Sequence, residues 1–135
     1  MANFTIAVAG KGGVGKTTTC GMIVDYLTKK HDGPFNSALV EEDDYDLLVM
    51  GRTQGKGCYC FVNGVLKTQV DKYAGNYKYM VIDNEAGLEH IARGTLPHVD
   101  LLLLVSDSSR RGIQAVARIA EMVEELELKP GRMQL

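Results

Sequence analysis

Short, continuous runs of apolar residues recur along this chain of 135 residues and are separated by polar turns. Runs of this length are typical of strands that are buried on both faces of a sheet. The pattern predicts strands at 3–9, 46–51, 77–83 and 100–107. The last residues, "GRMQL", look like the opening of another strand.

Apolar residues between these runs follow helical spacing instead. Cys20, Ile23, Val24 and Leu27 lie three and four positions apart, which places them on one face of a helix after the first strand. Similar spacing predicts helices at 61–72 and 110–126. Strands that alternate with helices indicate an α/β fold, with a mostly parallel sheet and flanking helices.

The last of these helices is strongly amphipathic. Its expected inward residues are Ile113, Val116, Ala120 and Val123, and its expected outward residues are Glu121, Glu124 and Glu125.

Composition narrows the class of protein. The chain is 45% hydrophobic and 24% charged with a net charge of −2, and no basic block stands out, so we expect no nucleic acid partner. The apolar run at 101–105 is too short to cross a bilayer, so we expect no membrane partner. An odd number of cysteines and an N-terminus unlike a secretion signal predict a cytoplasmic protein. The length of 135 residues predicts a single domain over 1–135.

The segment "GKGGVGKT", Gly10 to Thr17, fits the phosphate-loop pattern G-x-x-x-x-G-K-[ST] between a strand and a helix. Its glycines allow backbone N–H groups to wrap anionic oxygens, Lys16 is expected to reach the β- and γ-phosphates, and the Thr17 hydroxyl is expected to ligate Mg²⁺. The alternative is a glycine-rich turn with a chance lysine. The residues expected to bind ATP or ADP here are Gly10, Lys11, Gly12, Gly13, Val14, Gly15, Lys16, Thr17 and Thr18.

A second lysine in this loop, Lys11, marks the deviant Walker A class, in which that lysine reaches nucleotide phosphate, typically across a dimer interface. The alternative is a solvated loop lysine. Asp83, at the end of "YMVID", stands where a Walker B aspartate holds Mg²⁺ through water, and the Gly87 N–H is expected to sense the γ-phosphate. Lys11, Lys16 and Asp83 are therefore the candidate catalytic residues, and the role of Glu85 is open.

Two of the three cysteines, Cys58 and Cys60, are separated only by a tyrosine. Two thiolates at this spacing supply half of the four ligands that a tetrahedral Zn²⁺ takes, and a four-cysteine set also suits Ni²⁺. A two-fold axis through the metal would double two ligands to four. The alternatives are buried small hydrophobic residues or a redox pair. Cys20 lies on an apolar helix face and is expected in the core.

Together, "AVAGKGGVGKTT", "DLLVMGRTQGKGCYCFVN", "VIDNEAGLEHIARGT" and "LLLVSDSSRRGI" resemble the CooC-type ATPases, which are nickel-insertion accessory proteins of carbon monoxide dehydrogenase. These ATPases are part of the deviant Walker A, MinD-like (SIMIBI) group of P-loop proteins. The resemblance implies an ATP-hydrolysing metallochaperone that forms a nucleotide-bound homodimer, in which Cys58 and Cys60 of both subunits bind one Ni²⁺ or Zn²⁺. The implied client is nickel carbon monoxide dehydrogenase.

Two departures from that family bear on activity. No apolar strand precedes the second predicted strand within 31–44, where the family has its switch I aspartate; Asp32 is the nearest candidate base. The chain also stops before the region that contacts adenine in the family, so we expect a shortened domain. The alternative functions are a MinD/ParA-like positioning ATPase, or a module that binds nucleotide or metal without turnover.

Overall fold

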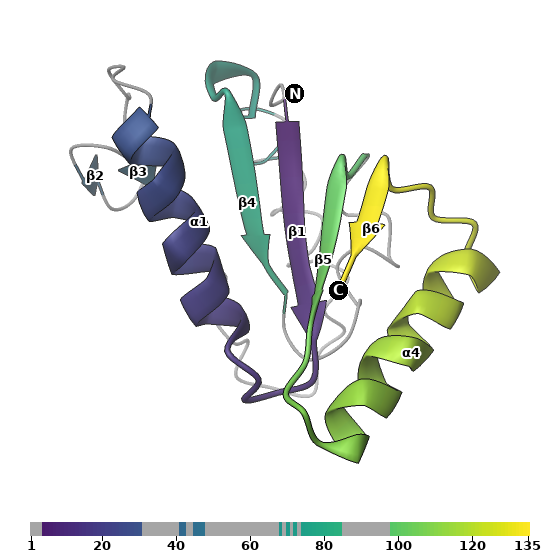
Figure 1. The fold of residues 1–135 in the computed structure, drawn as a ribbon. Helices are drawn as coiled ribbons and strands as arrows, with labels where there is room; N and C mark the ends of the chain where they lie inside the picture. Colours follow the sequence, from purple (N-terminus) through teal and green to yellow (C-terminus); the bar gives the residue numbers. More distant parts are fainter. Residues whose placement is uncertain are drawn as a thin grey trace, which may run out of the picture.

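A computed structural model describes residues 4–30, 41–42, 45–47, 68, 70, 72, 74–84 and 98–135. Its main element is a sheet of four parallel strands in the order β4-β1-β5-β6 (Figure 1). The strands are β1 (Phe4–Gly10), β4 (Tyr79–Asp83), β5 (Leu101–Val105) and β6 (Arg132–Gln134). The predicted α/β fold is confirmed, and so is the strand expected in the last residues.

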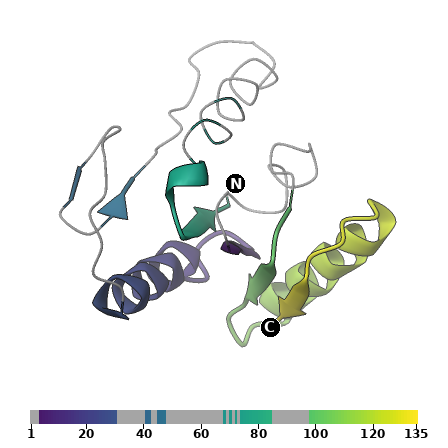
Figure 2. The same cartoon turned by 90° about the horizontal axis from the view of Figure 1, so that it is seen from above.

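Two helices cover opposite faces of this sheet (Figures 1 and 2). Helix α1 (Lys16–Lys30) contacts β4 and β1, and α4 (Arg110–Glu125) contacts β1. Successive residues of a strand point to opposite faces, so β1 supplies core residues to both helices. On the α4 side, the core consists of Ala7, Ala9, Val99, Leu102, Leu104, Val116, Ile119 and Val123.

The predicted inner face of α4 is only partly correct. Val116 and Val123 are buried and the three glutamates are exposed, but Ile113 is 54% exposed. The residues that face the core recur at 112, 116, 119 and 123, and at 3.6 residues per turn Ile113 lies about 90° around the helix from the middle of that face. Ile119, which the prediction left out, is buried in its place.

The middle of the chain is described in part. Glu41–Glu42 (β2) and Tyr45–Asp46 (β3) pair antiparallel in a small separate sheet, although the sequence predicted no strand within 31–44. Of the strand predicted at 46–51, only Asp46 and Leu47 are described, and Leu47 is not in a strand. Of the helix predicted at 61–72, the described residues 68, 70 and 72 are helical, and a 3₁₀ turn, η1 (Ala74–Asn76), precedes β4.

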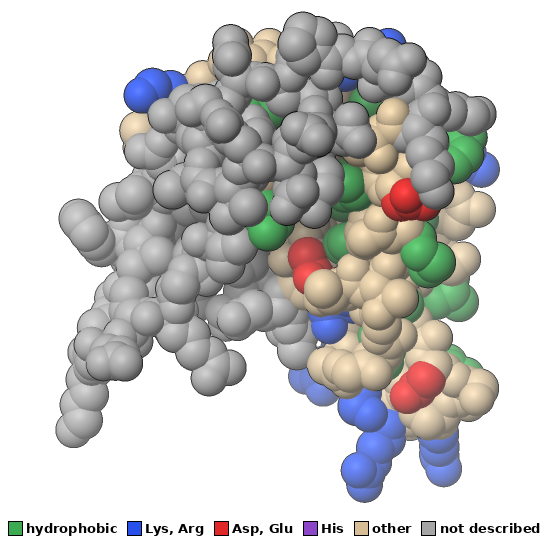
Figure 3. Space-filling model, turned by 90° about the vertical axis from the view of Figure 1, so that its left-hand side faces the viewer, with side chains coloured by type: hydrophobic (Ala, Val, Ile, Leu, Met, Phe, Trp, Pro, Cys, Tyr) green, Lys and Arg blue, Asp and Glu red, His purple; other side chains and the backbone are tan. Residues whose placement is uncertain are grey.

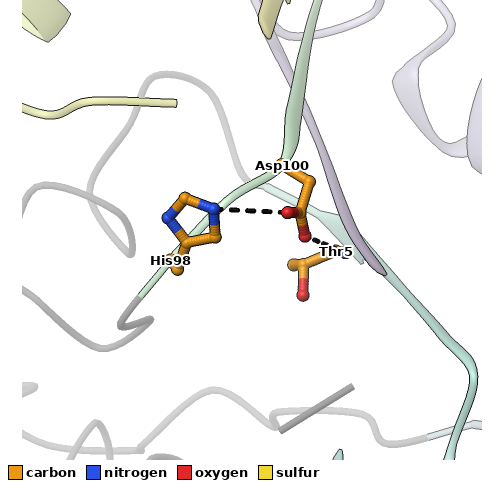
Figure 4. A network of polar contacts seen from close by, with 3 residues as sticks. All are labelled: Thr5, His98 and Asp100. Carbon is orange, nitrogen blue, oxygen red and sulfur yellow. Dashed lines mark hydrogen bonds and ion pairs between the residues drawn. The ribbon is translucent and has the colours of Figure 1, made fainter. Parts of the chain in front are cut away.

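Asp100 ties the amino end of β5 to β1 (Figure 4). Its Oδ2 accepts a hydrogen bond from the Thr5 backbone N at 2.7 Å, and its own backbone N donates to the Thr5 carbonyl at 3.0 Å. His98 Nε2 lies 3.2 Å from Asp100 Oδ1. These contacts align β1 and β5 near their first residues, and the parallel register of these two strands then pairs Gly10 with Val105.

Candidate functional site

The phosphate-loop segment lies at the carboxyl end of the sheet, between the last residue of β1, Gly10, and the first residue of α1, Lys16. Strand β5 ends level with β1, because Gly10 pairs with Val105, and β4 ends two residues earlier along β1, because Val8 pairs with Asp83. In parallel α/β sheets, ligands bind at the carboxyl ends of the strands. Basic side chains gather at the lower end of the face in Figure 3, the end at which the strands of Figure 1 terminate.

The loop takes a backbone course that glycine alone accommodates easily. A Cβ added to Gly10 would lie 2.2 Å from the Val105 carbonyl oxygen, so β1 and β5 approach closely where the loop begins. Gly13 and Gly15 have φ angles of 79° and 94°, which side chains with a Cβ rarely adopt. Gly12 has open space around it, so its small size is not a packing requirement of the loop.

Lys16 is buried inside the loop with 8% of its surface exposed. Its Nζ donates a hydrogen bond to the Lys11 carbonyl oxygen at 2.9 Å. The ammonium group therefore sits within the curve of the loop, and the free N–H groups of the first turn of α1 open on the same region. This arrangement places one full positive charge and a helix N-terminus where an anion can bind.

Thr17 and Asp83 come together beside the lysine. The Thr17 hydroxyl donates a hydrogen bond to Asp83 Oδ2, although the two residues are 66 positions apart. Both side chains are exposed. Hydroxyl and carboxylate oxygens are the ligand types that Mg²⁺ prefers, usually with nucleotide phosphate and water completing its shell. The donor set fits a magnesium nucleotide, with Thr17 and Asp83 on the metal side and Lys16 on the phosphate side.

Two residues near Asp83, Asn84 and Cys20, are buried. Asn84, which is 2% exposed, follows Asp83 and donates from both its backbone N (3.2 Å) and its Nδ2 (3.0 Å) to the Val8 carbonyl. Cys20 is buried in the core as predicted, and its burial, together with the nearby negative charge of Asp83, raises its pKa to about 11. The thiol is therefore protonated at neutral pH and acts as a small apolar residue.

The remaining residues of the predicted nucleotide loop are more open. Lys11 and Thr18 are exposed and Val14 is half-buried. Asp107, in the loop after β5, is also exposed, and hydrogen bonds from Ser109 and the charge of Lys11 lower its pKa. The sequence pattern predicted no role for Asn84 or Asp107. Ser109 caps α4. A segment such as "SDSS" before a helical pattern is typical of a helix N-terminus, and this is the sequence feature that points to Asp107.

Several predicted residues lie outside the described part of the chain: Gly87, Glu85, Asp32, Cys58 and Cys60. Their assignments stay predictions. Among the described residues, no group of three or more histidine, cysteine or acidic side chains could hold a metal ion. The helices within the described ranges also include none with the length and apolar character needed to cross a membrane.

Comparison of the whole fold identifies a related structure. The apo McdA structure from Cyanthece superposes with a TM-score of 0.62 and 20% sequence identity, covering 98% of this chain and 70% of that one. The likeness shows the fold: an α/β domain with a parallel sheet and flanking helices, as in apo McdA. This confirms the fold class that the sequence predicted, although no family model matches the chain.

Relatives by sequence are ATP-binding proteins. An uncharacterized ATP-binding protein of Methanocaldococcus jannaschii is 46% identical over 106 residues, which is 78% of this chain and 40% of that protein. The carbon monoxide dehydrogenase accessory protein CooC of Rhodospirillum rubrum is 36% identical over 93 residues, 67% of this chain and 35% of CooC. The chain thus spans well under half the length of these two relatives.

Proposed function

We propose that this chain is the nucleotide-binding part of an ATP-dependent metallochaperone of the CooC type. In this proposal the protein binds and hydrolyses ATP, forms a nucleotide-bound homodimer, and holds Ni²⁺ or Zn²⁺ between the subunits. The metal is cargo for a nickel enzyme, with carbon monoxide dehydrogenase as the client suggested by the CooC relative.

The observation that carries the nucleotide part is the meeting of Lys16, Thr17 and Asp83 at the carboxyl end of the sheet. Bound ATP supplies the γ-phosphoryl group and Mg²⁺ supplies charge neutralisation. Lys16 then binds phosphate oxygen, Thr17 holds the metal, and Asp83 orients its water shell. Lys11 is exposed on the loop. In this proposal it reaches the phosphate of a nucleotide bound to the same subunit or to the second subunit of the dimer.

The metal part of the proposal rests on the Cys58-Tyr-Cys60 sequence and on the 36% identity to CooC. Each subunit would contribute Cys58 and Cys60 to a four-thiolate site on the two-fold axis. Nucleotide and metal would then favour the same dimer, so each would tighten binding of the other.

Steady-state ATP hydrolysis with and without Ni²⁺ tests both parts at once. We expect Mg²⁺-dependent turnover above that of a Lys16→Ala control, and we expect Ni²⁺ to change the rate in the wild type but not in a Cys58→Ser/Cys60→Ser variant. Analytical ultracentrifugation with MgATP and Ni²⁺ should show a dimer.

Other results would contradict part of the proposal or favour a different function. Turnover no higher than that of Lys16→Ala would indicate a binding module without catalysis. Equal Ni²⁺ binding by wild type and the double cysteine variant, or a monomeric metal-bound form, would contradict the shared site. ATP-dependent pelleting with lipid vesicles or DNA would instead favour a positioning ATPase.

A further inference from the structure

The outer side of α4 carries charges of both signs, separated along the helix. The residues opposite its buried side are all exposed: Arg110, Gln114, Ala117, Arg118, Glu121 and Glu125. Arg111 and Glu124, which are also exposed, flank this side at its two ends. Most of these residues line a groove along the helix, and α4 lies at one side of the molecule, outside the sheet (Figures 1 and 2). We call this set of residues the α4 outer face.

The charges of the α4 outer face oppose the dipole of the helix. The first turn of α4 holds Arg110 and Arg111 and no acidic residue, and its last turn holds Glu124 and Glu125 and no basic residue. The amino end of a helix is positive and its carboxyl end is negative, so both placements are unfavourable. Among the residues that the structure describes, the charged members of this face form no ion pair. The described part of the chain therefore leaves this arrangement uncompensated.

A second copy of α4, packed antiparallel on the first, would compensate it. With a two-fold axis between Ala117 and Arg118, the basic start of each helix lies beside the acidic end of the other. The pairs are Arg110 with the partner's Glu124, Arg111 with the partner's Glu125 and Arg118 with the partner's Glu121. The dipoles of the two helices also attract in this orientation. Ala117, next to the axis, is small, and small side chains at a contact let helices approach closely.

We propose that the α4 outer face is a contact between two copies of this chain, packed antiparallel about a two-fold axis. A second copy is the occupant because the face is self-complementary: its three arginines meet three glutamates of an identical face. One helix face buries less than the roughly 1,200 Å² of a standard interface, and its ion pairs are screened by salt, so the association is weak and salt-dependent. The proposal goes beyond the proposed function and does not depend on it, because neither nucleotide nor metal takes part.

Sedimentation equilibrium without nucleotide tests the contact. A reductant and a chelator prevent dimers that form through Cys58 and Cys60. In about 20 mM salt we expect the wild type to associate at protein concentrations of about 0.1–1 mM, and in 0.5 M salt, where the Debye length falls to about 4 Å, at least about ten-fold more weakly. A wild type that stays monomeric up to about 1 mM at low salt would overturn the proposal.

Charge reversal at either end of the helix should break the contact. Arg110→Glu/Arg111→Glu and Glu124→Lys/Glu125→Lys each turn four ion pairs of the dimer into repulsions, so each should weaken association at least about ten-fold at low salt. Both variants place favourable charges at a helix end, so they should unfold at or above the temperature of the wild type. Loss of association in these variants is therefore not a loss of folding, and thermal denaturation checks this.

The variant that carries all four reversals is the matched control. It has the net charge of −2 of the wild type and restores every pair with the signs exchanged, so it should associate within about three-fold of the wild type. An equimolar mixture of the two double variants should likewise form a mixed dimer. Association that is unchanged in the double variants, or that is not restored when all four reversals are combined, would overturn the antiparallel contact. Absence of ATP turnover would contradict the proposed function and leave this result as it stands.

Discussion

The Thr17 hydroxyl donates a hydrogen bond to Asp83 Oδ2 and so joins the first turn of α1 to the carboxyl end of β4. Because Asp83 pairs with Val8 of β1, its carboxylate lies at the carboxyl end of the sheet. The short connection from Gly10 to Lys16 places the Thr17 hydroxyl at the same end. The register of the sheet therefore helps to bring together the two oxygen groups that we propose to act on Mg²⁺, Thr17 directly and Asp83 through water.

Removing the charge of Asp83 should impair Mg²⁺-dependent chemistry. We expect Asp83→Asn to lower the kcat/KM for MgATP by about 100-fold, because a poorly held metal loses several kcal/mol of transition-state stabilisation. The affinity for nucleotide without Mg²⁺ should change much less. Thr17→Ser, which keeps the hydroxyl, is the matched mild variant, and a larger loss in Thr17→Ser than in Asp83→Asn would contradict this assignment.

Gly10 is required by packing and Gly12 is not. Gly10→Ala places a Cβ against the Val105 carbonyl oxygen, so the strands must shift, and we expect a loss of about 1–3 kcal/mol in the free energy of unfolding. Gly12→Ala meets open space and should change it by no more than about 0.5 kcal/mol. Urea denaturation of both variants measures the difference, and equal losses would show that the close approach is relieved at little cost.

Asp100 should matter more than its partner His98. Asp100→Ala leaves the N–H of Thr5, a residue only 5% exposed, without its acceptor, which should cost about 1–3 kcal/mol. Asp100→Asn keeps an acceptor oxygen and should cost less. His98 is 53% exposed on its side chain, so His98→Ala should cost no more than about 1 kcal/mol. Thermal denaturation of the three variants ranks them, and a His98→Ala loss as large as that of Asp100→Ala would refute this order.

The Cys20 thiol should react slowly. In a Cys58→Ser/Cys60→Ser variant, Cys20 is the remaining thiol. A pKa of about 11 instead of 9.0 lowers its thiolate fraction at pH 8 about 100-fold, so alkylation by iodoacetamide should be slower by at least that factor than for a free thiol. Unfolding in urea should restore the ordinary rate, and fast alkylation of the folded protein would contradict the burial.

The same shift makes stability depend on alkaline pH. Because the folded-state pKa of Cys20 is raised, the unfolded chain loses this proton first, so its contribution to stability is complete below pH 9 and is lost as the pH rises towards about 11. Cys20→Ala should flatten the decline in the free energy of unfolding over that range. Equal slopes for the two proteins would assign the decline to other groups.

The sequence predicted the strands and helices of the main sheet because each carries a continuous local signal: a short apolar run or a 3.6-residue period. It predicted Lys16, Thr17 and Asp83 because the phosphate-loop pattern has fixed spacing and Asp83 ends a strand. It misplaced Ile113, because Ile113 and Ile119 both fit a helical spacing with Val116 and Val123, and only the packing of α4 on the sheet decides that Ile119 is buried and Ile113 is exposed. The role of Asp100 also depends on a partner in β1, 95 positions away, which no local pattern reveals.

The hydrogen bond from Lys16 to the Lys11 carbonyl has a consequence for affinity. The ammonium group that would meet phosphate already satisfies an oxygen of its own loop. An ammonium group carries three N–H donors, so one can stay on the loop carbonyl while the other two turn to an anion. The bond to the loop already holds Nζ in one place, so less side-chain freedom would be lost when an anion binds.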